Sequence, residues 1–286
     1  MINVLVTGSK GQLASCIKDL ENQYENINFI YTDYQGLDVC NRNQLKTFFE
    51  TQRNINYCIN CAAYTAVDKA ETEAEKAFEI NAIGAKNLAL VCNEFDTTLI
   101  HVSTDFVFDG EKTEPYIETD AAKPISVYGA SKLQGELEIQ KAIEKYFILR
   151  TSWLYSEHGN NFMKTMLRLA ETRDEISVIS DQIGTPTYAG DLAEVILEII
   201  NTKSTCFGVY HYSNEGAISW YNFAAAIFEI TKTQIKLNPI KTSAYPTPAK
   251  RPAFSVMDKT KIKRVLKNET SNWKESLKKQ LLIYKK

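Results

Sequence analysis

The chain has 286 residues, 44% of them apolar and 24% charged, with a formal net charge of -2. This length and balance are typical of a globular protein with a sizeable core, in one large or two ordinary domains. Acidic and basic residues are mixed throughout, which argues against binding to nucleic acid or to an anionic membrane. Because no apolar run approaches the length of a membrane span and the N-terminus lacks the layout of a signal peptide, we expect a cytoplasmic protein.

Cysteine usage agrees with a reducing compartment. The six cysteines are scattered through the chain without the spacing of a disulfide framework. Cys58 and Cys61 form a C-x-x-C pair, but they lie in an apolar run, where a strand would point them to opposite faces. We interpret both as small buried residues. The histidines are isolated from one another in the sequence, and we predict no His/Cys metal site (His101, His158, His211).

The first predicted element is a strand over 3–7, followed by a glycine-rich turn and a helix to about residue 24. The turn has the spacing G-x-x-G-x-x-A, with Ala14 as its small third residue. Glycines at such a turn allow a pyrophosphate to approach the backbone at the positive end of the helix. An ordinary helix cap is the alternative interpretation. The pattern predicts a dinucleotide site with contacts from Gly8, Lys10, Gly11, Gln12 and Leu13.

A second predicted strand, 28–32, ends at Asp33, and Asp38 and Val39 follow. A carboxylate at this place accepts hydrogen bonds from the adenosine ribose and repels a 2′-phosphate. No Arg or Lys lies between residues 32 and 41 to hold that phosphate, so the pattern favours NADH. Either aspartate is also explained as a turn residue. We therefore predict NADPH or NADH as cofactor, with Asp33, Asp38 and Val39 beside its adenosine half.

Strands continue to alternate with helices through the first half of the chain. A third strand is predicted over 57–61, before Ala62, Ala63 and Tyr64, and a fourth over 98–103, which leads into Ser103-Thr104-Asp105. This alternation predicts an α/β fold of the Rossmann type, with a doubly wound parallel sheet. Ligands of such sheets bind beyond the carboxyl ends of the strands. We expect one set of residues to meet there: Gly8, Asp33, Ala62, Ala63, Ser103 and Thr104.

A predicted helix over about 126–145 carries Tyr128 and Lys132 at positions i and i+4, which share one helix face. A positive charge beside a phenol favours the phenolate and lowers its pKa from about 10 toward the range of general acid–base catalysis. Such pairs also occur by chance on solvated helices. The Ser-Thr-Asp segment upstream favours the catalytic interpretation.

In the second half of the chain, predicted strands and helices alternate less regularly. The predicted elements are a strand over 147–151, a helix ending at 172, a strand over 176–180, a helix over 189–200, a strand near 209–212, a helix over 219–231 and a Pro-rich loop over 245–252. No second glycine pattern appears. We predict a nucleotide-binding domain over 1–150 and a smaller substrate-binding lobe over 151–286, with the segment 176–202 returning to the first domain.

The order of these motifs resembles the extended short-chain dehydrogenase/reductases, and finer segments resemble one family among them, the dTDP-4-dehydrorhamnose reductases. The similar segments cover nearly the whole chain: AAYTAVDKAE (62–71), STDFVFDG (103–110), VYGASKLQGE (127–136), RTSWLY (150–155), NNFMKTMLRLA (160–170), DQIGTPT (181–187) and YPTPAKRP (245–252).

The resemblance implies NAD(P)H-dependent reduction of the C4 ketone of dTDP-4-dehydro-β-L-rhamnose, a nucleotide-linked 4-keto-6-deoxyhexose. Tyr128 would protonate the developing alkoxide, Thr104 would hydrogen-bond the same oxygen, and Lys132 would tune Tyr128 and hold the nicotinamide ribose. The implied substrate residues are Val67, Thr104, Asp105, Phe106, Trp153 and Arg251. Phe106 stands where the family often has tyrosine. Ordinary core packing explains Val67 and Trp153 equally well. A solvated position in an exposed loop is the alternative interpretation of Arg251.

Some members of the family are magnesium-bridged dimers, joined through glutamates that begin in the first helix. Ser15 and Cys16 occupy that region here, so we expect no metal and either a monomer or a homodimer.

Three alternatives remain at the sequence level. A related dehydratase needs an Asp-Glu pair after the threonine, and Asp105-Phe106 lacks the second carboxylate. Another nucleotide-sugar 4-ketoreductase or a 4-epimerase would use the same Thr, Tyr and Lys. A non-catalytic regulatory subunit of this fold is the third, although the retained Tyr128, Lys132 and Thr104 count against it.

Overall fold

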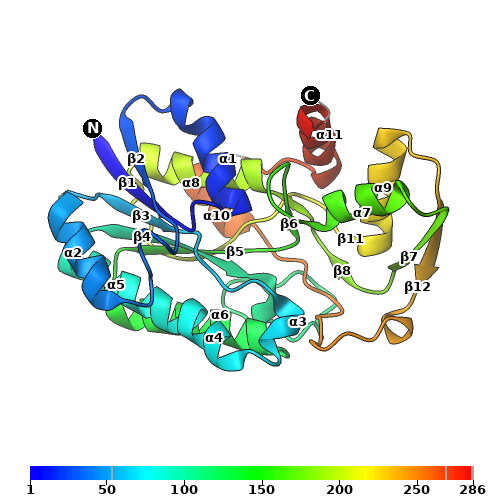
Figure 1. The fold of residues 1–286 in the computed structure, drawn as a ribbon, viewed down its shortest axis with the longest axis horizontal. Coiled ribbons are helices and arrows are strands. Elements are labelled where there is room, and N and C mark those ends of the chain that lie inside the picture. Colours follow the sequence, from blue (N-terminus) through cyan, green and yellow to red (C-terminus); the bar gives the residue numbers. More distant parts are fainter. Residues whose placement is uncertain (53, 268, 285–286) are drawn as a thin grey trace.

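In the computed structural model, the described residues are 1–52, 54–267 and 269–284. A six-stranded parallel sheet in the order β10-β5-β4-β3-β1-β2 lies at its centre (Figure 1). The strands are β1 (Ile2–Thr7), β2 (Ile27–Tyr31), β3 (Tyr57–Asn60), β4 (Thr98–Thr104), β5 (Tyr146–Thr151) and β10 (Gly208–His211). The chain runs from β1 out to β2 and back across to β3, which makes β1 and β3 the switch point of the sheet. The predicted doubly wound Rossmann fold is confirmed.

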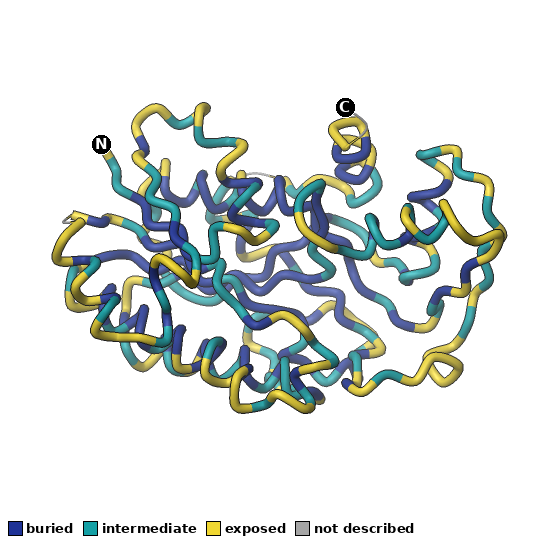
Figure 2. The backbone as a smooth tube through the Cα atoms, viewed as in Figure 1, coloured by how far each residue is buried: buried dark blue, intermediate teal, exposed yellow. Residues whose placement is uncertain are grey.

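Helices cover both faces of this sheet. One face carries α1 (Gln12–Leu20), α8 (Ala189–Asn201) and α10 (Thr260–Leu266), and the other carries α2 (Arg42–Gln52), α5 (Ala85–Glu94) and α6 (Val127–Ala142). Val4, Leu5 and Val6 of β1 are therefore fully buried in succession. This continuous apolar run is expected of a parallel strand covered on both sides. Figure 2 shows the same pattern, with a buried sheet inside a more exposed layer of helices and loops.

The crossover from β3 to β4 is the most irregular one. It contains α3 (Val67–Ala70) and α4 (Ala74–Phe78), then a π-helical segment (Glu79–Gly84) that runs directly into α5. Three short 3-10 segments lie elsewhere, at Glu21–Gln23, Asp105–Val107 and Thr242–Ala244.

A smaller lobe packs beside the sheet. It is built on α7 (Phe162–Ala170), α9 (Trp220–Thr231) and α11 (Trp273–Tyr284), around a core that includes Phe223, Ile227 and Leu277. The parallel pair β7 (Glu175–Ile179) and β12 (Lys236–Ile240) lies along its outer side (Figure 1). Two-residue strands join its loops: β6 (Leu154–Tyr155) with β9 (Thr187–Tyr188), and β8 (Ile183–Gly184) with β11 (Ile218–Ser219).

The second half of the chain is divided between these two bodies. The strand β7 pairs with β12 in the lobe, whereas α8 packs on α1 and β10 extends the central sheet. The division into domains over 1–150 and 151–286 stays a prediction, and its last two residues lie outside the described residues.

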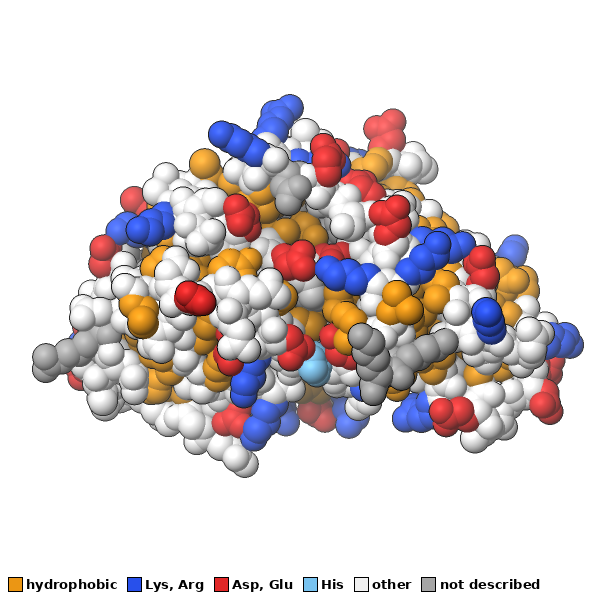
Figure 3. All heavy atoms as spheres, turned by 90° about the horizontal axis from the view of Figure 1, so that it is seen from above, with side chains coloured by type: hydrophobic (Ala, Val, Ile, Leu, Met, Phe, Trp, Pro, Cys, Tyr) orange, Lys and Arg blue, Asp and Glu red, His pale blue; other side chains and the backbone are white. Residues whose placement is uncertain are grey.

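Charges of both signs are interspersed over the face seen from above (Figure 3), in agreement with the small net charge. Among the described residues, no helix is long and apolar enough to cross a membrane.

Candidate active site

The glycine-rich turn between β1 and α1 forms one wall of the site. Gly8 has a φ of +64°, and a Cβ atom there would lie 2.7 Å from the backbone nitrogen of Ala62. Glycine suits this combination of left-handed backbone and close approach. Gly11 stands at the N-terminus of α1, and Ala14 is fully buried. The turn therefore directs the positive end of α1 at the space beyond the strands.

A cleft of about 670 Å³ opens at this edge of the sheet. Most of the predicted site residues line it: Lys10, Gly11, Gln12, Leu13, Ala63, Val67, Ser103, Thr104, Asp105, Phe106, Tyr128, Lys132, Trp153 and Arg251. Six predicted cofactor residues do not line the cleft itself: Gly8, Asp33, Asp38, Val39, Ala62 and Tyr64. The lining comes from both halves of the chain, so that the lobe closes the space above the sheet.

The residues predicted beside the adenosine half have defined roles in the structure. Asp33 accepts hydrogen bonds from the backbone of Gln35 and Gly36 and forms an ion pair with Lys10. Asp38 accepts one from the Cys40 backbone nitrogen at 2.9 Å, as a turn residue does. Asp33 is thus the aspartate that lies next to the glycine-rich turn.

Tyr128 and Thr104 come from two different elements and meet in the cleft. Thr104 is the last residue of β4, and Tyr128 lies in the first turn of α6, where Ser126 caps the Gly129 nitrogen at 3.1 Å. Burial raises the pKa of Tyr128 to about 12, and a hydrogen bond with Thr104 offsets part of that rise. The two hydroxyl groups are therefore adjacent in a poorly solvated place.

Lys132 does not act on Tyr128 as the sequence led us to expect. Its ammonium donates to the backbone oxygen of Val102 at 2.7 Å and lies 3.2 Å from His101 Nε2. Burial lowers the pKa of Lys132 to about 8. The predicted lowering of the Tyr128 pKa is thus wrong for this structure, because desolvation outweighs any effect of the cation.

Asp105 follows Thr104 and is almost completely buried. Burial raises its pKa to about 6, and its Oδ1 accepts a hydrogen bond from the Thr104 hydroxyl at 3.1 Å. This hydrogen bond from Thr104 to Asp105 fixes the orientation of the Thr104 side chain at the wall of the cleft.

Aromatic rings shape one part of the cleft. The Phe106 ring meets the Tyr128 ring edge-on, at 5.5 Å between centroids. Trp153 has a φ of +47°, and its indole stacks on Trp220 with centroids 3.5 Å apart. The indole also lies close to Gly184, where a Cβ would come within 2.6 Å of the ring. Trp153 is therefore packed tightly against both a glycine and a second tryptophan.

Arg251 reaches across the mouth of the cleft to α3. Its guanidinium donates to both carboxylate oxygens of Asp68, at 3.1 and 2.8 Å. Val67 lines the cleft beside that ion pair. The Pro-rich loop is thus fastened to the first half of the chain, so Arg251 is not a free solvated side chain.

Four residues important to this geometry were not identified from the sequence. None of the four carries a local motif: Asn60, Asn81, His101 and Trp220. Asn81 bonds both backbone groups of Tyr64 and donates to Ser131 Oγ at 2.9 Å. Neighbouring strands and the helix crossing bring these side chains together, which no short spacing could show.

The cysteines and histidines were only partly anticipated. Cys58 and Cys61 pack on opposite faces of the sheet as expected, although Cys61 is only partly buried and lines the cleft. Cys16, Glu157 and His158 have ligand-type atoms within 4.8 Å of one another, and His158 bonds Asp19 at 2.6 Å. The absence of a metal site stays a prediction.

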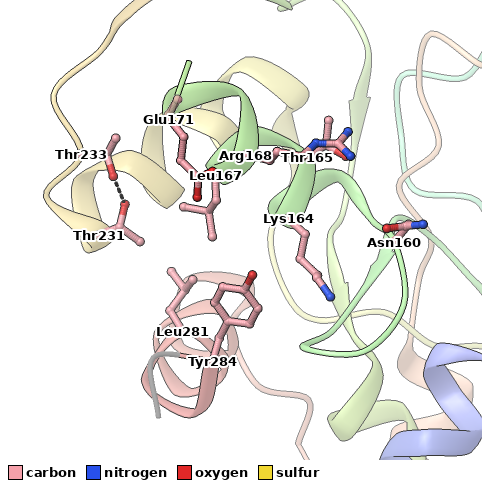
Figure 4. Close-up of a pocket in the computed structure, with 11 residues that line it drawn as sticks. Asn160, Lys164, Thr165, Leu167, Arg168, Glu171, Thr231, Thr233, Leu281 and Tyr284 are labelled. Carbon is pink, nitrogen blue, oxygen red and sulfur yellow. Dashed lines mark hydrogen bonds between the residues drawn. The ribbon is translucent and has the colours of Figure 1, made fainter. Parts of the chain in front are cut away.

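A second cavity of about 560 Å³ lies in the smaller lobe, between α7, α9 and α11 (Figure 4). Lys164 lies over the ring of Tyr284 there, 5.8 Å from its centroid. No predicted site residue lines this cavity.

Comparison with known proteins agrees with this geometry. The family model described as the RmlD substrate binding domain matches residues 2–285. A dTDP-4-dehydrorhamnose reductase of Aggregatibacter actinomycetemcomitans is 42% identical over 97% of this chain and 98% of its own length. The chain belongs to the dTDP-4-dehydrorhamnose reductase family. The resemblance stated from the motifs is confirmed, and the protein is an NAD(P)H-dependent oxidoreductase.

Solved structures of the dTDP-4-dehydrorhamnose reductase family are also similar. One from Clostridium acetobutylicum has a TM-score of 0.95 at 42% identity, covering 100% of both chains. One from Bacillus anthracis, in complex with NADP, has a TM-score of 0.95 at 39% identity and covers 99% of this chain and 100% of its own. A Thermus thermophilus UDP-glucose 4-epimerase complex with NAD, 19% identical with a TM-score of 0.82, shares the fold alone.

Proposed function

We propose that this protein reduces the C4 ketone of dTDP-4-dehydro-β-L-rhamnose to dTDP-L-rhamnose, with hydride from NADPH or NADH. The observation that carries the proposal is the meeting of Thr104 and Tyr128 in one cleft, directly beyond a glycine-rich turn that suits a dinucleotide. The names of the curated relatives support the nucleotide sugar as substrate.

The turn fits the pyrophosphate of such a cofactor. The positive end of α1 faces the cleft, and the backbone at Gly8 leaves no room for a larger side chain. Gln12 is fixed on the far side, where its Oε1 accepts a hydrogen bond from Asn161 at 2.8 Å. When bound, the nicotinamide supplies the hydride.

Tyr128 and Thr104 perform the acid–base part of the reaction. As the carbonyl carbon receives hydride, the oxygen gains negative charge, and the phenol of Tyr128 donates its proton to it. The Thr104 hydroxyl, on exchanging its bond to Asp105, donates a hydrogen bond to the same oxygen. Two donors fixed in a desolvated cleft stabilise the developing charge more than water would. Lys132, whose pKa of about 8 leaves it charged at neutral pH, assists by favouring the phenolate that remains.

The aromatic residues hold the sugar ring against these hydroxyl groups. Trp153 is held in place by its stacking on Trp220 and its close packing against Gly184. Phe106 presents an apolar edge beside Tyr128. We assign Arg251 and Val67 to the mouth of the cleft, where Arg251 is near enough to meet the diphosphate if it exchanges its bond to Asp68.

The test is product analysis by NMR after incubation with dTDP-4-dehydro-L-rhamnose, related nucleotide-linked 4-keto sugars and either cofactor. We expect reduction at C4 with stoichiometric oxidation of the nicotinamide. Tyr128→Phe should lower kcat by about 10²- to 10⁴-fold, the usual contribution of a general acid. Tyr24→Phe, which removes a hydroxyl outside the cleft, is the control.

The alternatives give different outcomes in the same experiment. A 4-epimerase would interconvert sugars without net oxidation of added cofactor, and a regulatory subunit would turn over none of the substrates. Equal rates for the protein and Tyr128→Phe would refute the assigned mechanism. The cytoplasmic location and the choice between monomer and homodimer stay predictions.

A further inference from the structure

Glu71 lies at the end of α3 and contacts the helix that carries the proton donor. Its Oε1 accepts a hydrogen bond from the backbone N–H of Val127 at 2.9 Å. Val127 is the first residue of α6, and Tyr128 is the second. A carboxylate from another element is therefore bonded to the chain one residue before Tyr128.

This bond meets a need that the start of every helix has. The first N–H groups of an α-helix find no partner within the helix itself. At α6, the Ser126 side chain accepts from the Gly129 nitrogen at 3.1 Å, and the Ser126 carbonyl accepts from the Ala130 nitrogen at 2.9 Å. Neither bond serves the N–H of Val127, which donates to Glu71 instead. The positive end of the helix also favours a negative charge at this place.

The segment that leads into α6 gives the helix little polar support of its own. Residues 121–125 have no regular secondary structure. Within the part of the chain that the structure describes, they form no hydrogen bond. The bond from Val127 to Glu71 is thus the first tertiary hydrogen bond that the chain makes as it passes from this loop into α6.

Tyr128 is supported from its other side by the π-helical segment. The Ser131 hydroxyl donates to the Tyr128 carbonyl oxygen at 2.8 Å and accepts from Asn81 Nδ2 at 2.9 Å. Val127 and Tyr128 also pack against a small buried cluster that includes Ala70 of α3. The backbone around Tyr128 is therefore held between the π-helical segment and α3, and Glu71 supplies the polar contact on the α3 side.

The helix α3 is itself fixed in place, so that Glu71 starts from a stable position. Asp68, three residues earlier, accepts from the Arg251 guanidinium at 2.8 Å and from the Ala249 backbone N–H at 3.2 Å. Ala70 is fully buried. The Pro-rich loop, α3 and the start of α6 thus form one continuous set of contacts beside the cleft.

We infer that Glu71 is a positioning residue for the reaction, which fixes the first turn of α6 and thereby the place of the Tyr128 hydroxyl in the cleft. The inference rests on the proposed function, since it concerns the proton that Tyr128 donates. Glu71 is not among the residues that line the cleft, and it acts through the backbone of Val127.

Two substitutions separate the hydrogen bond of Glu71 from its charge. Glu71→Ala removes the acceptor, whereas Glu71→Gln removes the charge and keeps an amide oxygen that accepts from the Val127 N–H. A misplacement of about 1 Å can cost about 10²-fold in rate, and relaxation of one helical turn is smaller, so Glu71→Ala should lower kcat roughly tenfold. Its KM should stay close to that of the parent, because the lining of the cleft is unchanged. Glu71→Gln should restore most of kcat.

Steady-state kinetics with dTDP-4-dehydro-L-rhamnose and NADPH measure this split between kcat and KM. Glu75→Gln, at an exposed position of α4, is the matched control and should behave as the parent does. Urea unfolding of each variant shows how much of the protein is folded in the assay. A Glu71→Ala variant that is less stable in urea but keeps the parental kcat would refute the positioning role. An equal loss of kcat in Glu71→Gln and Glu71→Ala would also refute it, because the charge would then be what matters.

Hydrogen exchange tests the same contact without turnover. Mass spectrometry of the free protein follows the amides of residues 126–133, with those of α5 as the reference for opening of the whole domain. We expect faster exchange at the start of α6 in Glu71→Ala, near-parental exchange in Glu71→Gln, and no change in α5. Unchanged exchange at the start of α6, or an equal increase in α5, would overturn the inference whatever the protein reduces. A parent protein that reduces none of the sugars would instead count against the proposed function.

Discussion

At the scale of single residues, the pair formed by Lys10 and Asp33 bears on cofactor choice. The sequence showed no cation between residues 32 and 41, and on that ground favoured NADH. The structure brings Lys10 to Asp33 from the glycine-rich turn, and this hydrogen-bonded ion pair lowers the pKa of the carboxyl. Lys10 is largely exposed, so its side chain is free to move to a 2′-phosphate. The preference for NADH inferred from Asp33 alone did not include this cation.

We predict that Lys10→Ala lowers kcat/KM with NADPH by roughly tenfold, the effect of about 1.4 kcal/mol, and changes kcat/KM with NADH far less. The reason is that Lys10 pairs with Asp33, the carboxylate that follows β2, and so brings a positive charge to the place where a 2′-phosphate would lie. Steady-state kinetics with both cofactors measure the difference. Lys141→Ala, at the far end of α6, is the matched control. An equal loss with both cofactors would assign Lys10 to the shared pyrophosphate instead.

Local spacing revealed only part of the site at this scale. Tyr128 and Lys132 were identifiable because one helix carries both, and Thr104 because it ends a predicted strand. His101 was not, because its partners come from β3 and α6 and its own segment is an ordinary apolar strand. The pKa of Tyr128 was predicted in the wrong direction, since burial cannot be read from two residues four positions apart.

At the scale of elements, α6 holds the catalytic residues by unusually close backbone packing. A Cβ at Gly129 would lie 2.2 Å from the Phe106 carbonyl oxygen, and one at Gly135 would lie 2.2 Å from the Asn81 carbonyl oxygen. The helix is therefore in backbone contact with the segment after β4 on one side and with the π-helical segment on the other. Lys132 lies between these two fixed points, and Tyr128 directly precedes the first of them.

We predict that Gly135→Ala destabilises the protein by about 1–3 kcal/mol, because overpacking forces α6 and the π-helical segment apart. Alanine stabilises an isolated helix more than glycine does, so helix propensity alone predicts that this substitution would stabilise the protein. Urea unfolding measures the free energy of unfolding. Gln140→Ala, at an exposed position of the same helix, should remain within about 0.5 kcal/mol of the parent. A stabilised Gly135→Ala variant would show that this contact relaxes without cost.

Long periodic elements were predictable from the sequence, and short or atypical ones were not. The strands and helices of the central sheet follow from apolar runs and glycine turns. The missed elements include β12, which contains Pro239 and has no clear alternation, and α10, which is rich in Lys and Arg. Their placement depends on β7 and on the sheet, which supply the contacts their own residues do not indicate.

At the scale of the whole molecule, the two halves of the chain are interleaved. The helix α8 and the strand β10 belong to the second half, yet they cover and extend the central sheet. Arg251 fastens the Pro-rich loop back to Asp68 of the first half. The chain order of motifs was sufficient to predict the Rossmann fold, and the segment predicted to return to it, 176–202, contains α8, but the addition of β10 to the sheet was not predicted.

We predict that residues 1–150 alone do not fold. Five side chains of α8 are fully buried against the first half: Leu192, Ile196, Leu197, Ile199 and Ile200. At about 2 kcal/mol for each buried side chain, their loss removes roughly 10 kcal/mol, which is comparable to the total stability of a typical protein. The fragment also leaves β5 as an open edge. Circular dichroism and urea unfolding of the fragment, with the full chain as control, measure this. A cooperative transition in the fragment would show that α1 and the sheet suffice, and that α8 is an addition to a domain already complete.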